Sequence, residues 1–217
     1  MFSRRKAEMV AESDALPGRT TPMPVTLPHR TLSVPITAPF EEPFEIGYFA
    51  LGCFWGAERE FFEAPGVRTT AVGYMGGFTP NPTYEEVCSG RTGHAESVMV
   101  VIDPTKTSYE ATLSLFFESH DPTQGFRQGN DIGTQYRSAI YTTNPRQHEL
   151  AIRARDAYAT MLAAAGFSAP TTEIAEAGPF FYAETYHQQY LVENPNGYCG
   201  LGSTGVSCPV GVFTSES

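Results

Sequence analysis

The sequence lacks any run of roughly 18 apolar residues, so no segment is expected to cross a membrane as a helix. Positive charge is also scarce. The chain has 14 lysines and arginines against 24 aspartates and glutamates, which gives a formal net charge of -10. Because the few cations do not cluster, a phosphate backbone would be repelled, and no nucleic-acid partner is expected. No internal repeat divides the 217 residues, which predicts a single hydrophobic core. We expect the protein to be a monomer.

Cysteine is sparse, and its spacing does not fit a zinc site. The chain has Cys53, Cys88, Cys199 and Cys208, with no Cys-x-x-Cys pair. The five histidines do not fall at zinc-ligand spacing either, so no metal is expected. Acidic residues follow the basic residues 4–6 where an export signal would need an apolar core. The sequence therefore predicts a cytoplasmic protein whose thiols are reduced or redox-active.

Three segments differ in composition. Residues 1–45 are rich in proline and lack periodicity, which predicts an extended N-terminal arm. Residues 46–193 carry the periodic patterns of a catalytic α+β domain. Residues 194–217 are dominated by glycine, asparagine, proline and serine, which predicts a coil that packs on the same domain.

Apolar periodicity within 46–193 predicts strands and helices in a definite order. The expected strands are 46–51, 67–74, 96–102, 138–142 and 171–175, and the expected helices are 53–63, 109–117 and 145–165. The last helix has Asn144 as its N-cap and a predicted buried stripe of Leu150, Ala154, Ala157 and Met161. This order predicts the α+β class: a two-layer α/β sandwich with a mixed central sheet of the split βαβ, ferredoxin-like kind.

The most informative motif is Gly52-Cys53-Phe54-Trp55-Gly56, which places a thiol between a buried strand and a helix. At a helix N-terminus, unpaired N–H groups and the helix dipole favour an anion, so the motif predicts a populated, nucleophilic thiolate at Cys53. Phe54 and Trp55 could form an apolar wall for a small nonpolar group, or could simply pack in the core. The segment alone leaves these two readings equally open.

Further candidates lie on the second central strand and in a polar loop. Glu96 is in phase with Val98 and Val100, so it is either a buried, protonated acid or an exposed strand-end carboxylate. Asp131 and Tyr136 belong to a glycine-bearing loop of the kind that lines sites, and could orient a substrate.

The last two cysteines lie within the glycine-rich segment 197–208. A pliable tail can carry a second thiol to an oxidised Cys53 and pass the oxidation to a third thiol. A structural disulfide or two idle thiols is the less favoured reading, because a fixed bridge has no need of so much glycine.

Together the motifs resemble a known family, methionine sulfoxide reductase type A, the peptide-methionine (S)-S-oxide reductases. The resemblance covers most of the chain and is weakest over the first 40 or so residues. It rests on residues 52–56, 81–84, 88–90, 93–96, 120–123, 130–138 and the tail. It implies thiol-dependent reduction of the S epimer of methionine sulfoxide, free or in proteins, with thioredoxin as the reductant and no cofactor.

The resemblance also implies a role for each candidate residue. Cys53 matches the nucleophile, Glu96 the acid, Cys199 the resolving thiol and Cys208 the recycling thiol, while Phe54 and Trp55 match the methyl-binding wall, Tyr84 and Tyr136 hydroxyls near the sulfoxide oxygen, Asp131 a substrate-holding group, and Cys88 a non-catalytic position. Attack by Cys53 yields methionine and a sulfenic acid, which condenses readily with a nearby thiol.

Two other readings remain at this point. One is a non-enzymatic redox or metal-binding module built on Cys53, Cys199 and Cys208. The other is a thiol hydrolase in which His94 or His187 activates Cys53, since Cys–His pairs perform acyl transfer. A hydrolase would leave the tail thiols without a purpose.

Overall fold

The computed structural model describes residues 8–209, and its main sheet has six strands in the order β7-β6-β1-β3-β2-β8. These strands are β1 Glu45–Leu51, β2 Val67–Met75, β3 Ala95–Ile102, β6 Ser138–Thr142, β7 Glu173–Glu176 and β8 Phe181–Tyr182. The helices are α1 Phe54–Phe62, α2 Tyr84–Cys88, α3 Tyr109–Ser119, α4 Pro145–Ala164 and α5 Tyr190–Glu193. A small hairpin of β4 Arg127–Gln128 and β5 Asp131–Ile132 and the 3-10 turns η2 Glu12–Asp14 and η3 Thr134–Tyr136 complete the list.

The four central strands confirm the predicted split βαβ arrangement. They lie in the order β6-β1-β3-β2, and each neighbouring pair is antiparallel. β1 and β2 therefore run parallel to each other with β3 inserted between them, and α1 makes the connection. β7 pairs parallel with β6, which makes the sheet mixed as predicted.

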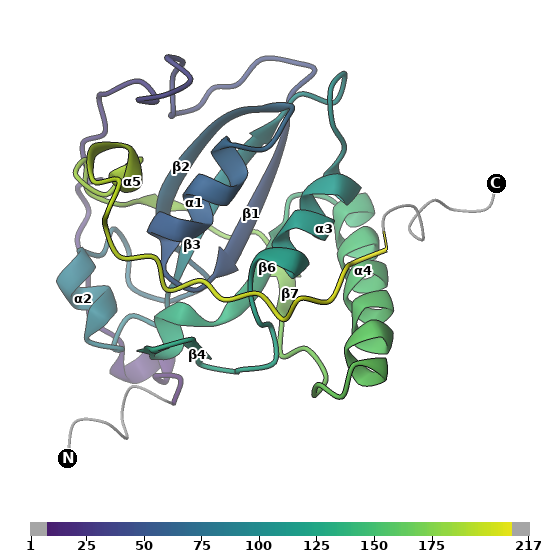
Figure 1. Cartoon of the computed structure of the whole chain (residues 1–217). Helices are drawn as coiled ribbons and strands as arrows, with labels where there is room; N and C mark the ends of the chain where they lie inside the picture. The colour runs from purple at the N-terminus through teal and green to yellow at the C-terminus, as the bar shows by residue number, and fades with distance from the viewer. Residues whose placement is uncertain (1–7, 210–217) are drawn as a thin grey trace.

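The sheet is covered on both faces. Helices α1, α3 and α4 lie on one face, as Figure 1 shows. Val98 and Val100 of β3 point into the main core under these helices, while Met99 and Val101 point the other way and pack with Ile36. All eight residues of β3 are buried for this reason. The chain that precedes β1 thus supplies the second cover of the sheet.

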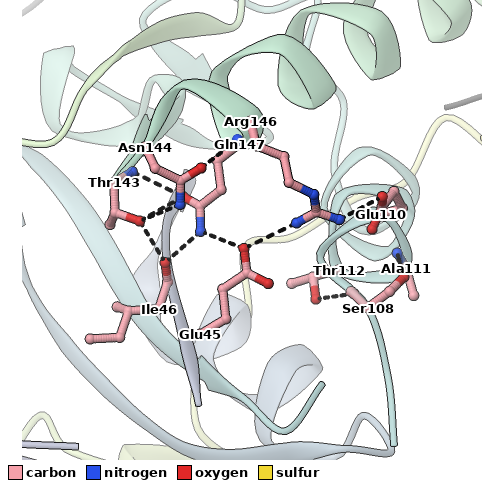
Figure 2. Close-up of polar contacts among 10 residues, drawn as sticks. All are labelled: Glu45, Ile46, Ser108, Glu110, Ala111, Thr112, Thr143, Asn144, Arg146 and Gln147. Carbon is pink, nitrogen blue, oxygen red and sulfur yellow. Dashed lines mark hydrogen bonds and ion pairs between the residues drawn. The ribbon is translucent and has the colours of Figure 1, made fainter. Parts of the chain in front are cut away.

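A polar network fixes the start of α4 against β1 and α3 (Figure 2). Asn144 is the predicted N-cap, and its Oδ1 accepts a hydrogen bond from the Gln147 N–H at 2.9 Å. The Gln147 side chain is buried and donates to Glu45 Oε1 at 3.0 Å. Arg146 lies between Glu45 and Glu110 and forms an ion pair with each. The network lies at the far end of β1 from the motif at 52–56.

The predicted buried stripe of α4 is partly wrong. Leu150 and Ala154 are buried as expected, but Met161 is 42% exposed. The buried side chains in the second half of the helix are Tyr158 and Leu162, so the stripe advances in steps of four residues. The Tyr158 hydroxyl bonds to the C-terminal tail, which satisfies its polar end and lets the ring enter the core.

Candidate active site

Cys53 stands at a sharp turn between β1 and α1, as the sequence predicted. Gly52 has φ +110, and a side-chain carbon added there would lie 2.7 Å from Gln128 Cγ, so only glycine fits this turn. Cys53 is the residue before the first turn of α1, and the N–H groups of Trp55 and Gly56 are directed at its sulfur. The end of β1 positions the Cys53 thiol, and the first turn of α1 supplies the N–H donors directed at it.

The predicted resting thiolate is wrong. Cys53 is only 7% exposed, and burial, with a smaller contribution from Glu96, raises its pKa well above the ordinary thiol value. The N–H groups of Trp55 and Gly56 lower the pKa, but desolvation outweighs them. Cys53 therefore rests as a thiol rather than as a thiolate.

Glu96 is the buried, protonated acid of the two readings that the sequence left open. It lies on β3 opposite Tyr74 and is 2% exposed. Its Oε2 accepts the Phe54 N–H at 2.9 Å, which places the carboxyl beside the turn that carries Cys53. Burial raises the pKa of Glu96 to about 8, so the group carries a proton at neutral pH.

Tyr84 and Tyr136 face the same space as Cys53 and Glu96. Tyr84 is the first residue of α2, whose start is fixed by the capping box of Thr83 and Glu86. Burial raises the pKa of Tyr84, and Glu96 and Cys53 contribute to the rise. These hydroxyls therefore stay protonated.

Tyr136, at the end of η3, shows the same effect. Burial raises its pKa, with further contributions from Glu96, Tyr84 and Asp131. The two hydroxyls are close enough to Glu96 to interact with it electrostatically, and the Tyr84 hydroxyl is also hydrogen-bonded with Cys88.

Asp131 opens β5 at the rim of this space. Burial raises its pKa, a side-chain hydrogen bond with Tyr198 opposes the rise, and its Oδ2 is buried. A side-chain carbon on Gly200 would lie 2.3 Å from this oxygen, so the tail backbone approaches Asp131 as closely as glycine allows. A carboxyl group at the rim can also accept a hydrogen bond from a bound molecule, since each of its oxygens has two acceptor sites.

Phe54 and Trp55 have different surroundings. Phe54 is 1% exposed and belongs to the main core. The Trp55 ring is half-buried, stacks on Tyr190 with ring centroids 3.9 Å apart, and donates its indole N–H to His187 Nδ1 at 3.0 Å. The sequence did not single out Tyr190, because it lies in a short, aperiodic segment.

Cys199 packs against α1 close to the turn that carries Cys53. Its sulfur would be 2.7 Å from a side-chain carbon at Gly56, and Arg59 Nη2 lies 3.7 Å from it. The thiol is exposed. The structure thus places the second thiol over the first turns of the helix that Cys53 begins.

Cys208 occupies a different place. In Figure 1 the end of the described chain crosses below α1 and runs past α3 to α4. Cys208 is 3% exposed, its N–H donates to Glu118 Oε1 at 2.7 Å, and burial raises its pKa to about 11. The Tyr158 hydroxyl, 2.8 Å from Thr204 Oγ1, holds the intervening tail. The third thiol is therefore docked on α3 and shielded.

The structure shows all four cysteines as thiols. Cys88 ends α2 beside Tyr84 and is half-buried. Within residues 8–209, no group of three or more His, Cys, Asp or Glu side chains is arranged to hold a metal ion. The same residues include no helix long and apolar enough to span a bilayer.

Comparison with known proteins agrees with the motifs. The sequence model described as "Peptide methionine sulfoxide reductase" matches residues 45–207. The peptide methionine sulfoxide reductase MsrA of Rhodospirillum centenum is 58% identical over 210 residues, 97% of this chain and 96% of the relative. The solved methionine sulfoxide reductase A of Corynebacterium diphtheriae is 48% identical with a TM-score of 0.84, over 94% of this chain and 99% of that one.

Two structures of Mxr1 from Saccharomyces cerevisiae are also similar. The reduced form is 30% identical, with a TM-score of 0.68 over 75% of this chain and 92% of that one. Mxr1 in complex with Trx2 is matched at 18% identity and a TM-score of 0.51, over 76% of this chain and 93% of that one, which is a likeness of fold.

Proposed function

Because the chain belongs to the peptide methionine sulfoxide reductase family, we propose that Cys53 attacks the sulfur of the S epimer of methionine sulfoxide, free or in proteins, while Glu96 protonates the oxygen. The single observation that carries this mechanism is the meeting of a helix-start thiol with a buried acid whose Oε2 accepts the Phe54 N–H. A sulfoxide is a poor electrophile until its oxygen is protonated or strongly hydrogen-bonded. Glu96, with its pKa near 8, supplies that proton at neutral pH.

The first step transfers one oxygen atom. Attack joins Cys53 Sγ to the methionine sulfur. This bond and the bond between the methionine sulfur and its oxygen then break as the oxygen becomes bonded to Cys53 Sγ. The products are methionine and a Cys53 sulfenic acid, and the methionine sulfur gains the two electrons that Cys53 loses. Glu96 gives its proton to the oxygen and regains one from the Cys53 thiol, so the acid is restored. These steps use side chains alone.

The other site residues hold the substrate. The Trp55 ring and Phe54 contact the methyl group, and the hydroxyls of Tyr84 and Tyr136 hydrogen-bond the sulfoxide oxygen. Asp131 accepts a donor from the substrate, for which its buried Oδ2 is suited. A sulfoxide whose methyl and oxygen were exchanged would put oxygen on the apolar wall, which explains selection of one epimer.

The tail then resolves the sulfenic acid in two exchanges. The Cys199 thiol, already placed over α1, attacks Cys53 and releases water as a disulfide forms. Cys208 next attacks Cys199, which frees the Cys53 thiol and leaves Cys199 bonded to Cys208. Two thiols of thioredoxin reduce that last bond. Mxr1, whose fold is similar to that of this chain, has been solved in complex with Trx2. Because Cys208 is docked on α3, the tail must detach from α3 before Cys208 can attack Cys199.

The activity is tested by incubating the protein with each sulfoxide epimer and dithiothreitol and measuring methionine. Methionine from the S epimer alone is the expected result. A thiol hydrolase is the weaker alternative, because His94 directs both ring nitrogens at backbone groups of residues 77 and 79, and His187 Nδ1 accepts the Trp55 N–H. A protein that yields no methionine from either epimer is not this enzyme.

We place this activity in a monomer in the cytoplasm. One chain carries every residue of the proposed site, so no second copy is needed to complete it. A thiol cycle that ends on thioredoxin also requires a reducing compartment. The arm, the catalytic domain and the tail are proposed to act as one unit, with residues 1–45, 46–193 and 194–217 as their bounds.

The relay predicts different arrested states for the two tail thiols. We expect Cys199→Ser to form one equivalent of methionine per enzyme and then stall with thioredoxin, because the sulfenic acid cannot be resolved. We expect Cys208→Ser to accumulate a disulfide between Cys53 and Cys199. Peptide mass spectrometry after one turnover without reductant identifies these bonds. A trapped bond that contains Cys88, or full thioredoxin cycling in Cys199→Ser, contradicts the order of the relay.

The docked tail predicts unequal alkylation in the resting enzyme. The Cys199 thiol is exposed, whereas Cys208 is buried with its pKa raised to about 11, so iodoacetamide should modify Cys199 first. We expect a difference of at least about tenfold in rate, since only the accessible thiolate reacts. Tyr158→Phe removes the hydroxyl that holds the tail and should speed labelling of Cys208. Equal rates for both thiols contradict the docked tail.

A further inference from the structure

Glu58 is a buried carboxyl that the proposed mechanism does not use. It lies on α1 five residues after Cys53 and is 0% exposed. Three donors are directed at it: the Thr70 hydroxyl at 2.9 Å and Gln189 Nε2 at 2.6 Å reach Oε1, and the Gln189 N–H reaches Oε2 at 2.7 Å. Such a donor set stabilises a buried carboxylate. Burial nonetheless raises the pKa of Glu58 to about 7, so its contribution comes from these directed hydrogen bonds rather than from a fixed charge.

The donors continue into the N-terminal segment. His29 Nδ1 accepts the N–H groups of residues 31 and 32, which leaves its proton on Nε2. His29 Nε2 therefore donates to Thr70 Oγ1 at 3.0 Å, and Thr70 in turn donates to Glu58. The next residue, Arg30, donates from its backbone N–H to Gln189 Oε1 and from Nε to the Gln188 carbonyl. Glu58 thus joins α1 to two segments far away in the sequence.

Gln189 holds the partners of the Trp55 ring. It has φ +49, a left-handed conformation that a non-glycine residue keeps only when its contacts enforce it. The residues on either side carry the contacts of Trp55: His187, two before it, accepts the indole N–H, and Tyr190, directly after it, stacks on the ring. Gln188 is fixed separately by hydrogen bonds to both backbone groups of Val72.

We propose that Glu58 is a positioning residue that sets the pose of the substrate-contacting Trp55 ring by fixing Gln189, and this inference rests on the proposed function of Trp55. The chain of contacts is continuous. Glu58 fixes the backbone N–H of Gln189, Gln189 fixes the turn between His187 and Tyr190, and these two rings fix the indole. His29 and Arg30 support the same contacts from the N-terminal segment, through hydrogen bonds to Thr70 and to the Gln189 side chain.

The test uses Glu58→Gln and the single tryptophan of the chain. A glutamine that keeps its oxygen at the Oε1 position directs its amide donors at the Gln189 N–H, so that N–H loses its acceptor. Because Trp55 is the sole tryptophan, intrinsic fluorescence reports directly on this ring. We expect a shifted Trp55 emission and a rise in KM for free S-epimer methionine sulfoxide of about tenfold, the low end of what one methyl contact in an apolar pocket is worth. With dithiothreitol as reductant, kcat should stay within about twofold, since Cys53 and Glu96 keep their contacts.

Glu45→Gln is the matched control. Glu45 is also a hydrogen-bonded carboxylate in a polar network, but it joins β1 to α4 away from the site (Figure 2). Glu45→Gln should lower the melting temperature of the protein without changing Trp55 emission or KM. If Glu58→Gln does not fold, Gln189→Asn should shift Trp55 emission and KM in the same direction but less, because it shortens the side chain that donates to Glu58 Oε1 and keeps the backbone N–H on Oε2. Asparagine tolerates the left-handed backbone.

A double-mutant cycle separates positioning from general loosening. In a Trp55→Phe background the indole ring and its N–H are gone, so Glu58→Gln should raise KM by less than about twofold further. The effects of residues that act through one another are not additive. An equal KM effect in both backgrounds, or unchanged emission and KM in folded Glu58→Gln, overturns the inference. The proposed function fails separately, through a wild-type protein that forms no methionine from either epimer. An unchanged KM in Trp55→Phe removes the proposed role of Trp55 and, with it, the inference.

Discussion

Cys53→Ser is expected to abolish methionine formation even with excess dithiothreitol. The serine hydroxyl fits the same turn, but it is a far weaker nucleophile than sulfur, and it cannot accept the oxygen from a sulfoxide as a sulfenic acid. We expect kcat to fall by about 10³-fold or more, as is usual when the group that forms the covalent intermediate is lost. The measurement is methionine released from the S epimer, since dithiothreitol bypasses the tail thiols.

Cys88→Ser is the matched control for this experiment. Cys88 lies beside Tyr84 at the end of α2, and a serine there can replace its hydrogen bond. Activity should remain within a few-fold of wild type. Substantial turnover by Cys53→Ser would move the nucleophile to another thiol.

Glu96→Ala is expected to lower kcat/KM by about 10²–10⁴-fold, the usual contribution of a general acid. Alanine also leaves the Phe54 N–H without its acceptor, so the turn at Cys53 loses part of its support. Glu96→Gln keeps an acceptor and a hydrogen-bond donor but cannot transfer a proton. It should lose less than Glu96→Ala where hydrogen bonding dominates. Equal activity in wild type and Glu96→Ala would exclude both roles.

The pH profile gives an independent reading of Glu96. Burial raises its pKa to about 8 in the folded protein, so the acid form is populated below that pH and lost as the pH rises through it. kcat/KM of the wild type should therefore fall on the alkaline side of about pH 8. Glu96→Gln, which does not titrate, should lose this limb of the profile. A limb that persists unchanged in Glu96→Gln belongs to another group.

Short elements show where sequence patterns stop being informative. α2 and α5 contain too few residues to show a helical period, and β8 is only two residues long. The sequence predicted none of them, although Thr83 and Glu86 form the capping box that starts α2. α2 carries Tyr84 and α5 carries Tyr190, so part of the site's frame was beyond the reach of periodicity.

The thiol at residue 53 shows a second limit. The helix start predicts a lowered pKa, and the structure does contain the two N–H groups that lower it. Burial decides the outcome in the other direction, and burial at a turn depends on which distant segments cover it. Here Gln128 closes over Gly52, and the tail lies on Gly56.

The sequence by itself determined the split βαβ order, the strand-to-helix turn at Cys53, and the family, because periodicity, glycine and local motifs are properties of adjacent residues. Only the tertiary structure decided that Glu96 is the buried acid, that Cys53 rests as a thiol, and that Cys208 is shielded on α3. It also revealed Glu58 as the link between the N-terminal segment and the Trp55 ring. Each of these depends on desolvation or on hydrogen bonds between residues far apart in the chain, and no local pattern encodes which segments come to lie together.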